Sequence, residues 1–135
     1  MLATWLYISV CNVASDAHAT TISDILAVSR PRNLELSVTG ALIFSGPSFA
    51  QAIEGPADNI ATLRAAIERD PRHRDVRTFE HGACEARRFE KWALAYSGSS
   101  TFVDLELQRI AALRATDPTT ALRSLKLLLK EFARG

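Results

Sequence analysis

Hydrophobic and polar positions change their spacing along the chain, and each change predicts a new element of secondary structure. Residues 1–11 are almost continuously apolar and rich in β-branched and aromatic side chains, a pattern typical of a strand buried on both faces. From Thr20 or Thr21 the apolar spacing becomes helical, and Pro31 is expected to end that helix. Its apolar side carries Ile22, Ile25, Leu26 and Ser29. The chain is therefore expected to begin with a buried strand and a helix that has a single apolar edge.

The next segment predicts two strands and a second helix. Residues 36–44 and 48–53 are apolar runs separated by Ser-Gly-Pro, which indicates a β-hairpin with its turn at residues 45–47. Pro56 then begins a helical pattern that runs to about Arg69. The apolar side of this second helix consists of Ile60, Leu63 and Ile67. The order up to this point is strand, helix, strand, strand, helix.

The remaining sequence predicts further strands and a pair of helices. Residues 76–79 and 92–96 have strand-like patterns on either side of a charged loop. Beyond residue 98, leucine-rich stripes with helical spacing lie on both sides of a turn at residues 117–118. We therefore expect an α+β fold, a ferredoxin-like β-α-β-β-α-β(-β) sandwich with two appended C-terminal helices. Residues 1–98 form the sandwich in this division, and residues 99–135 form the helical extension.

A sheet of this kind carries its first two helices on one face and leaves the other face open. Side chains alternate along a strand, so Leu6, Ile8 and Val10 share one face of the first strand. We expect these apolar residues to lie on the open face. An exposed apolar face must be covered, either by the two terminal helices or by a second subunit.

The composition places the chain among globular proteins. It has 135 residues, of which 47% are hydrophobic and 23% charged, with a formal net charge of +1. The length fits one domain, and no apolar run reaches the roughly 18 residues of a membrane-spanning helix. The N-terminal segment lacks the basic start of a signal peptide, and Cys11 and Cys84 form no metal or disulfide pattern. These features favour a cytoplasmic protein with reduced thiols and no charge-based affinity for nucleic acid or membranes.

The usual signatures of enzymes and metal sites are missing. The sequence has no glycine-rich phosphate loop, no HExxH or GxSxG motif, and no His/Cys cluster at ligand spacing. Polar residues nevertheless occur inside segments that otherwise resemble a core, namely Tyr7, Ser9, Asn33 and Gln51. Taken singly, each of them is explained by a structural role, because a buried phenol or amide only has to satisfy its hydrogen bonds.

The segment that joins these residues carries a more specific signal. Residues 33–55, NLELSVTGALIFSGPSFAQAIEG, closely resemble the central motif of the BLUF family, the blue-light sensors that use flavin. Residues 6–9, 69–76 and 87–92 are similar to further family motifs and follow in the family order. The resemblance extends over roughly residues 2–98 and includes the order of strands and helices predicted above.

The resemblance implies a flavin ring between the first two helices, on the sheet face to which Tyr7 and Gln51 point. It places Asn33 near the C4 carbonyl of the ring, and Arg72 and His73 near the C2 carbonyl. The other residues implied at the flavin are Ser9, Ile22, Ile25, Leu26, Phe49, Leu63 and Ile67, with Ile60 beside the last two. FAD is the cofactor that the family implies, and no phosphate-binding loop in the sequence distinguishes it from FMN.

The resemblance implies a photoreceptor rather than an enzyme. Tyr7 is expected to pass an electron and then a proton to the excited flavin through Gln51, whose amide would end rotated or tautomerised. The product would be a changed hydrogen-bond network and a small red shift of the flavin absorption. Trp92 and Leu94 are expected to carry the signal; Leu94 stands where the family commonly has Met, so we expect intact photochemistry and altered output. Trp5 is either a competing electron donor or a buried core residue.

The C-terminal segment points to output by interaction. The roughly 35 residues after Gly98 are too few for a catalytic domain. The layout resembles short BLUF proteins, which implies a homo-oligomer and contact with a separate effector protein, such as a cyclic-dinucleotide enzyme or a transcription regulator. Alternatively, the two C-terminal helices only cover the open face of the sheet and have no role in signalling.

Three other functions compete with this one. An acylphosphatase-like hydrolase shares the ferredoxin-like fold and uses an Arg with an Asn, but residues 11–15 lack the glycine of its oxyanion loop. A nucleic-acid surface formed by the basic residues of 69–77 is disfavoured by the aspartates between them. A non-photoactive binding module that has lost its flavin is disfavoured by the polar residues retained in the flavin motif.

Overall fold

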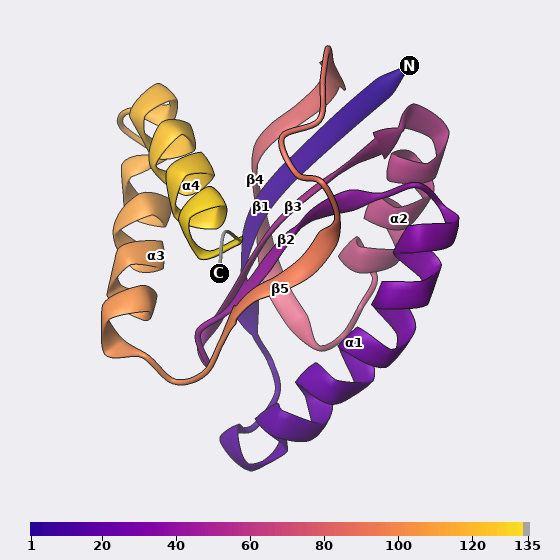
Figure 1. Ribbon diagram of the computed structural model, residues 1–135. Helices are drawn as coiled ribbons and strands as arrows, with labels where there is room; N and C mark the ends of the chain where they lie inside the picture. Colours follow the sequence, from indigo (N-terminus) through magenta and orange to yellow (C-terminus); the bar gives the residue numbers. More distant parts are fainter. Residues whose placement is uncertain (134–135) are drawn as a thin grey trace.

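A mixed sheet of five strands lies between two pairs of helices in the computed structural model, which describes residues 1–133 (Figure 1). The strands are β1 (Leu2–Cys11), β2 (Thr39–Phe44), β3 (Ser48–Pro56), β4 (His73–Cys84) and β5 (Trp92–Ser97). The helices are η1 (Ser15–Ala17), α1 (His18–Glu35), α2 (Ala57–Glu68), α3 (Thr101–Leu113) and α4 (Pro118–Ala133). The strand order is β4-β1-β3-β2-β5, with only β2 and β5 parallel among the described neighbours. This arrangement confirms the predicted α+β sandwich with two appended helices.

The first helix is longer than predicted, because it does not end at Pro31. α1 begins at His18 and continues through Pro31 to Glu35. A proline has no N–H to donate to the carbonyl one turn earlier, here that of Ala27. Both Ala27 and Pro31 are exposed, so water reaches the carbonyl that is left without a partner. Asn33 therefore lies inside the helix and is buried, rather than following the helix end as expected.

The β2–β3 hairpin forms with its turn at residues 45–47 as predicted, but β2 begins at Thr39 rather than at residue 36, because Leu36 caps α1, and β3 continues to Pro56. Gly40 of β2 has a φ angle of 152°. A Cβ atom at this position would lie 1.9 Å from the carbonyl oxygen of Ala52. Only glycine permits the two backbones to approach this closely, so Gly40 sets the separation of β2 and β3.

The fourth strand is also longer than predicted, since residues 73–84 rather than 76–79 are extended. β4 forms the edge of the sheet and pairs only with β1 among the described strands. Most of its residues are exposed or half-buried, and its ends are rich in charged and polar side chains. An edge strand with this composition gives little hydrophobic signal, which explains why the sequence pattern revealed only its middle.

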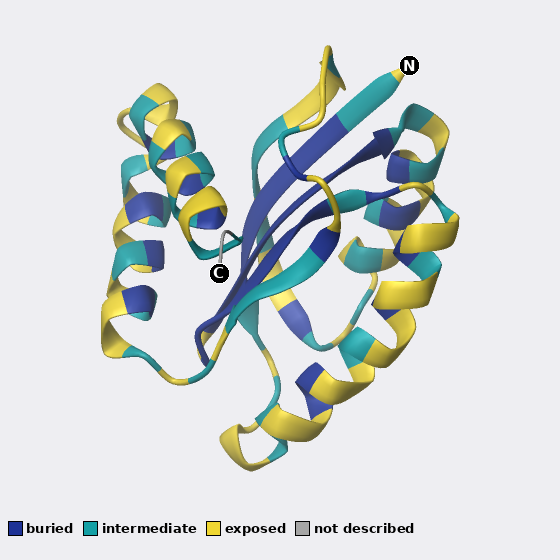
Figure 2. Ribbon diagram, viewed as in Figure 1, coloured by how far each residue is buried: buried dark blue, intermediate teal, exposed yellow. Residues whose placement is uncertain are grey.

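Two separate cores form on the two faces of the sheet (Figure 2). Leu6 and Ile8 of β1 pack against the inner sides of α3 and α4, which bury Val103, Leu107, Ile110, Ala121, Leu125 and Leu129. Trp5 and Tyr7 point to the opposite face, into the core beneath α1 and α2. The terminal helices therefore cover the face that was expected to be open, and Val10 at its margin stays half-buried. The predicted domain boundary at residue 98 falls in the loop between β5 and α3.

None of the helices described within residues 1–133 has the length and apolar character that a membrane crossing requires.

Candidate functional site

Three side chains from three strands form a buried hydrogen-bonded chain. Tyr7 on β1 and Gln51 on β3 are direct partners in the β-ladder, so their side chains leave the same face of the sheet. Gln51 Nε2 donates to the Tyr7 hydroxyl oxygen at 2.8 Å, and Trp92 Nε1 donates to Gln51 Oε1 at 3.0 Å. An indole N–H can only donate, so the Gln51 oxygen must face Trp92 and its nitrogen must face Tyr7. The chain therefore fixes the orientation of the Gln51 amide.

Tyr7 is neutral in this site. Burial raises the pKa of its hydroxyl strongly; the hydrogen bond from Gln51 lowers it less, and the negative charge of Asp70 raises it further. The hydroxyl oxygen accepts from Gln51, and among the hydrogen bonds of residues 1–133 none uses its proton. The Tyr7 proton is consequently available to an acceptor that binds next to the phenol.

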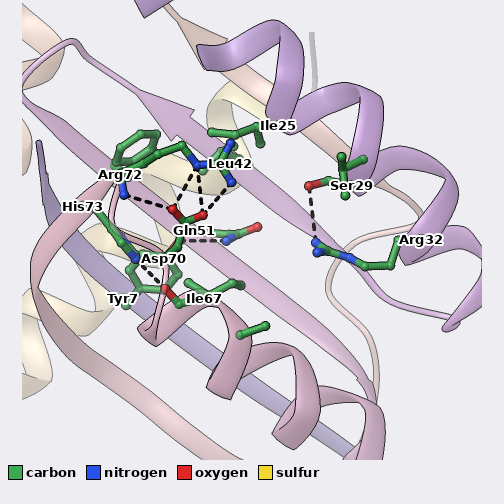
Figure 3. Close-up of a pocket in the computed structure, with 13 residues that line it drawn as sticks. Tyr7, Ile25, Ser29, Arg32, Leu42, Gln51, Ile67, Asp70, Arg72 and His73 are labelled. Carbon is green, nitrogen blue, oxygen red and sulfur yellow. Dashed lines mark hydrogen bonds and ion pairs between the residues drawn. The ribbon is translucent and has the colours of Figure 1, made fainter. Parts of the chain in front are cut away.

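A cavity of about 130 Å³ opens beside this chain, between α1, α2 and the sheet (Figure 3). Its walls come from Tyr7, Ile25, Val28, Ser29, Arg32, Leu42, Phe49, Gln51, Ala66, Ile67, Asp70, Arg72 and His73. Apolar side chains of both helices line it, and its polar groups come from the sheet, from the loop after α2, and from Ser29 and Arg32 on α1. Such a slot suits a flat ring with polar edges.

Seven of the residues predicted at the flavin line this cavity: Tyr7, Ile25, Phe49, Gln51, Ile67, Arg72 and His73. The remaining five, Ser9, Ile22, Leu26, Asn33 and Leu63, do not line it and lie in the surrounding core. Ile60 is also part of that core. The sequence interpretation missed Val28, Ser29, Arg32, Leu42, Ala66 and Asp70. Ser29 could have been found from the sequence, because it lies on the same predicted helix face as Ile25, which was assigned to the flavin.

Asp70 holds Arg72 by several hydrogen bonds. The Asp70 carboxylate accepts from Arg72 Nε at 3.0 Å, from its Nη2 at 2.5 Å and from its backbone N–H at 2.9 Å. Burial raises the pKa of the Asp70 carboxyl, but the hydrogen bonds and charge of Arg72 outweigh this and lower it overall. Those same hydrogen bonds raise the pKa of Arg72. Arg72 therefore lines the cavity as one half of an ion pair with Asp70, a partner that was not predicted from the sequence.

Both ring nitrogens of His73 are used within the protein. Nε2 lies 2.6 Å from the carbonyl oxygen of Ile67, and Nδ1 lies 2.7 Å from the Ser9 hydroxyl. A carbonyl oxygen only accepts, so Nε2 carries a hydrogen and a neutral ring accepts the Ser9 proton at Nδ1. His73 therefore joins the end of α2 to β1, and Ser9 serves the cavity by orienting this ring.

Asn33 is a buried amide with an unused donor. Its side chain is 1% exposed, and Oδ1 accepts from Arg32 Nε at 3.2 Å. Among the described residues, no group accepts a hydrogen bond from its Nδ2. An unpaired buried N–H is costly, so a carbonyl acceptor supplied by a ligand would relieve it.

A comparison with protein families identifies the family to which a chain with this site belongs. A family model described as BLUF, sensors of blue-light using FAD, matches residues 2–95. The chain belongs to this family. The matched segment is a blue-light-sensing flavin domain and includes every residue of the hydrogen-bonded chain and of the cavity. A family of sensors does not support the acylphosphatase-like alternative.

Individual relatives extend this picture. The chain is 34% identical over 91 residues to the blue light- and temperature-regulated antirepressor BluF of Escherichia coli (strain K12), covering 67% of the chain. It is 32% identical over 87 residues to the photoactivated adenylate cyclase subunit alpha of Euglena gracilis. The matched region spans only 22% and 8% of those two proteins.

Solved structures match almost the whole BLUF chain. The dark-state structure of BlrB, a BLUF protein, aligns with a TM-score of 0.72 and 29% identity over 95% of this chain and 97% of that one. The ground state of BlsA aligns with a TM-score of 0.77 over 96% of this chain and 88% of that one. At 20% identity, BlsA supports the fold alone. Both alignments extend beyond residue 95 and include the terminal helices.

The residues of the site fit the cofactor of the BLUF family. FAD contains a flat ring with carbonyl acceptors on one side, and the site offers the unused Asn33 amide N–H and the free Tyr7 proton. Ile25 and Val28 of α1 and Ala66 and Ile67 of α2 give the ring apolar walls. Within the part of the chain that the structure describes, no group of three or more metal-ligating residues occurs.

Proposed function

We propose that this chain is a blue-light photoreceptor in which Tyr7 and Gln51 perform the photochemistry and the C-terminal helices signal to a separate effector. The observation that carries the proposal is the buried chain Tyr7–Gln51–Trp92 at the wall of the cavity. FAD would lie in this cavity. Asn33 does not line the cavity but is hydrogen-bonded to Arg32, which does, so its buried amide would have to turn toward the cavity to donate to a ring carbonyl. Arg32 lines the same cavity and adds positive charge near the ion pair of Asp70 and Arg72.

When bound, FAD would absorb blue light and accept one electron. Tyr7 would supply that electron, and its hydroxyl proton would follow through Gln51 to the flavin, because burial penalises any charge that stays on the phenol. Both would then return to Tyr7, so that only the hydrogen bonds of Gln51 remain changed. In the orientation described above, Gln51 presents its nitrogen to Tyr7 and cannot accept this proton. The amide must therefore rotate or tautomerise while the proton moves.

A rotated Gln51 has a direct consequence for Trp92. Its NH₂ group would then face the Trp92 indole N–H, so that two donors oppose each other and the 3.0 Å hydrogen bond is lost. Trp92 is the first residue of β5, and Leu94 packs against the same core two residues later. The Leu94 side chain has no polar atom, so it cannot accept a new hydrogen bond from the rotated Gln51. We therefore propose that Trp92 transmits the change, because it loses its hydrogen bond to Gln51 and can move.

The loop before Trp92 is connected to the C-terminal helices. Glu54 on β3 accepts hydrogen bonds from the backbone N–H groups of Arg88 and Phe89, at 2.7 and 2.6 Å. On the other side of this loop, Lys130 of α4 donates to the Arg88 carbonyl at 2.8 Å. A displacement at Trp92 would reach α4 through this loop and through β5 itself, where the Tyr96 ring lies 5.3 Å from the Phe132 ring of α4.

The partner and the assembly are part of the proposal. Phe102, Leu105 and Leu127 leave large apolar side chains exposed on α3 and α4, which supports a protein-binding role for these helices. The effector would be a separate protein, such as a cyclic-dinucleotide enzyme or a transcription regulator, and the receptor itself would be a homo-oligomer. A cytoplasmic location belongs to the same proposal and is supported by the free thiols of Cys11 and Cys84.

A Tyr7→Phe variant tests the photochemical role. The phenyl ring keeps the packing of Tyr7, so the variant should bind FAD like the wild type but show no reversible light-induced shift. The output is tested by amide hydrogen exchange of the FAD-loaded protein in darkness and in blue light. We expect exchange to change in β5 and α4 of the wild type and to stay constant in the variant. A normal shift in Tyr7→Phe, or unchanged exchange in α4 of the wild type, would contradict the respective part of the proposal.

A further inference from the structure

We propose that Arg64 protects Trp5 from oxidation, so that the electron lost in the photoreaction comes from Tyr7 and is not replaced from Trp5. The inference rests on the proposed photochemical role of Tyr7. It assigns a function to a half-buried arginine of α2 that does not line the cavity.

Trp5 is well placed to exchange electrons with Tyr7. Its ring is fully buried and stacks on the Tyr7 ring, with a centroid distance of 4.5 Å and an interplanar angle of 27°. Electrons move readily between stacked aromatic rings at this distance, and an indole is oxidised about as easily as a phenol. Without a device that opposes it, Trp5 would compete with the productive reaction of Tyr7.

Arg64 places a positive charge on the Trp5 ring. The guanidinium carbon lies 4.8 Å from the ring centroid, and Nη2 donates to the Thr78 hydroxyl at 3.3 Å. An ion pair with Glu68 at 3.4 Å holds the other side of the guanidinium. A cation is attracted to a neutral indole, but it repels an indole that has lost an electron.

The indole proton of Trp5 has no base to receive it. Trp5 Nε1 donates to Thr78 Oγ1 at 3.0 Å, and the same oxygen accepts from Arg64. A neutral hydroxyl that already accepts two hydrogen bonds does not take a proton from an oxidised indole. Trp5 could therefore lose an electron only as a radical cation, directly beneath the guanidinium.

The competing step can be written out with its charges. After Tyr7 has given one electron and its proton towards the flavin, one electron would pass from Trp5 to the Tyr7 radical. The products would be a Trp5 radical cation and a Tyr7 phenolate. Burial raises the pKa of Tyr7, which means that the phenolate is strongly disfavoured, and Arg64 disfavours the cation. Both charges make the step unfavourable, and Arg64 acts most strongly on the charge of Trp5, because it contacts that ring directly.

Four variants test this proposal by flash spectroscopy of the FAD-loaded protein. Arg64→Leu removes the charge, Arg64→Lys retains it, and Trp5→Phe removes the donor both alone and together with Arg64→Leu. We expect tryptophan radical absorption to rise by about tenfold relative to tyrosine radical absorption in Arg64→Leu, with a lower yield of the red-shifted product. Arg64→Lys should behave like the wild type, and Trp5→Phe should restore the yield of Arg64→Leu.

A second arm does not depend on the photochemistry. The same proteins are exposed to a flash-generated soluble one-electron oxidant, and the radical absorption that disappears on adding Trp5→Phe is assigned to Trp5. We expect this Trp5 signal to be larger in Arg64→Leu than in the wild type. Equal radical ratios and yields in Arg64→Leu and the wild type would overturn the proposal. An enhanced Trp5 signal with the oxidant in Arg64→Leu, together with a wild type that lacks a light response, would instead support protection by Arg64 and refute the proposed photochemistry.

Discussion

The packing of α4 on the sheet can be tested with a pair of leucines two residues apart. Leu125 is 0% exposed and belongs to the core beneath α3 and α4, whereas Leu127 is 64% exposed on the same helix. Truncating each to alanine changes the same atoms in opposite environments. If α4 covers the sheet, the two substitutions must differ greatly in their effect on the free energy of unfolding.

The expected difference follows from burial. Leu125→Ala removes three buried carbon groups at about 0.8 kcal/mol each and leaves a cavity whose cost adds to this, so we expect a loss of about 3–4 kcal/mol. Leu127→Ala removes atoms that are already largely in water and replaces leucine with a slightly better helix former. We expect that variant to lie within about 0.5 kcal/mol of the wild type.

Urea unfolding followed by circular dichroism measures both free energies, provided that unfolding is two-state for all three proteins. A loss below about 1 kcal/mol for Leu125→Ala would refute the packing of α4 on the sheet. So would an equal loss for the two variants. In either case the connection from the loop before β5 to α4 would lose its structural basis.

Three further predictions concern single residues. Burial raises the pKa of the Glu80 carboxyl, but hydrogen bonds and charges from Arg88 and Lys126 outweigh it and hold that pKa below its usual 4.5. The resulting stability is present above the unfolded pKa and is lost as the pH falls through the folded one. Glu80→Gln should therefore lower the free energy of unfolding by up to about 1 kcal/mol at pH 7, and the difference from the wild type should shrink in acid. Urea unfolding at several pH values measures this difference, and a difference that does not depend on pH would contradict the prediction. Asn33→Leu should weaken FAD binding in a fluorescence titration, and unchanged affinity would exclude Asn33 as a ligand. It should destabilise the apoprotein by no more than about 1 kcal/mol, because Nδ2 is unpaired among the described residues and only the hydrogen bond from half-buried Arg32 to Oδ1 is lost. Gly40→Ala should destabilise the protein by more than about 3 kcal/mol in thermal unfolding, since the added Cβ meets the Ala52 carbonyl. Gly82→Ala is the control: its φ is 119°, but nothing lies within 4 Å of the added Cβ, so it should cost about 1 kcal/mol. Similar costs for the two variants would refute the close approach of β2 and β3 at Gly40.

The meeting of Tyr7 and Gln51 was predictable, because it depends on the alternation of side chains along two apolar strands. A strand that is buried on both faces leaves little freedom in its register, since a shift by one residue would exchange the two cores. The same alternation predicted that Leu6 and Ile8 would need a cover, and the leucine stripes of α3 and α4 supply it.

Other features depend on contacts that no local pattern contains. Pro31 is tolerated inside α1 because the helix is exposed at that point, and exposure is a property of the tertiary structure. The pairing of Asp70 with Arg72 depends on how the loop after α2 turns, so a spacing of two residues did not reveal it. Arg64 of α2 likewise lies over the Trp5 ring of β1, and these two elements are far apart in the sequence.

The central claim is that a flavin in this cavity exchanges hydrogen bonds with Tyr7 and Gln51 when it absorbs blue light. It is tested most directly by the absorption spectrum of the FAD-loaded wild type in darkness, immediately after blue light, and during the return to darkness. The account predicts flavin bands that shift slightly to the red and recover in the dark. A protein that binds no FAD, or one whose bound FAD shows the same spectrum before and after illumination, would contradict it.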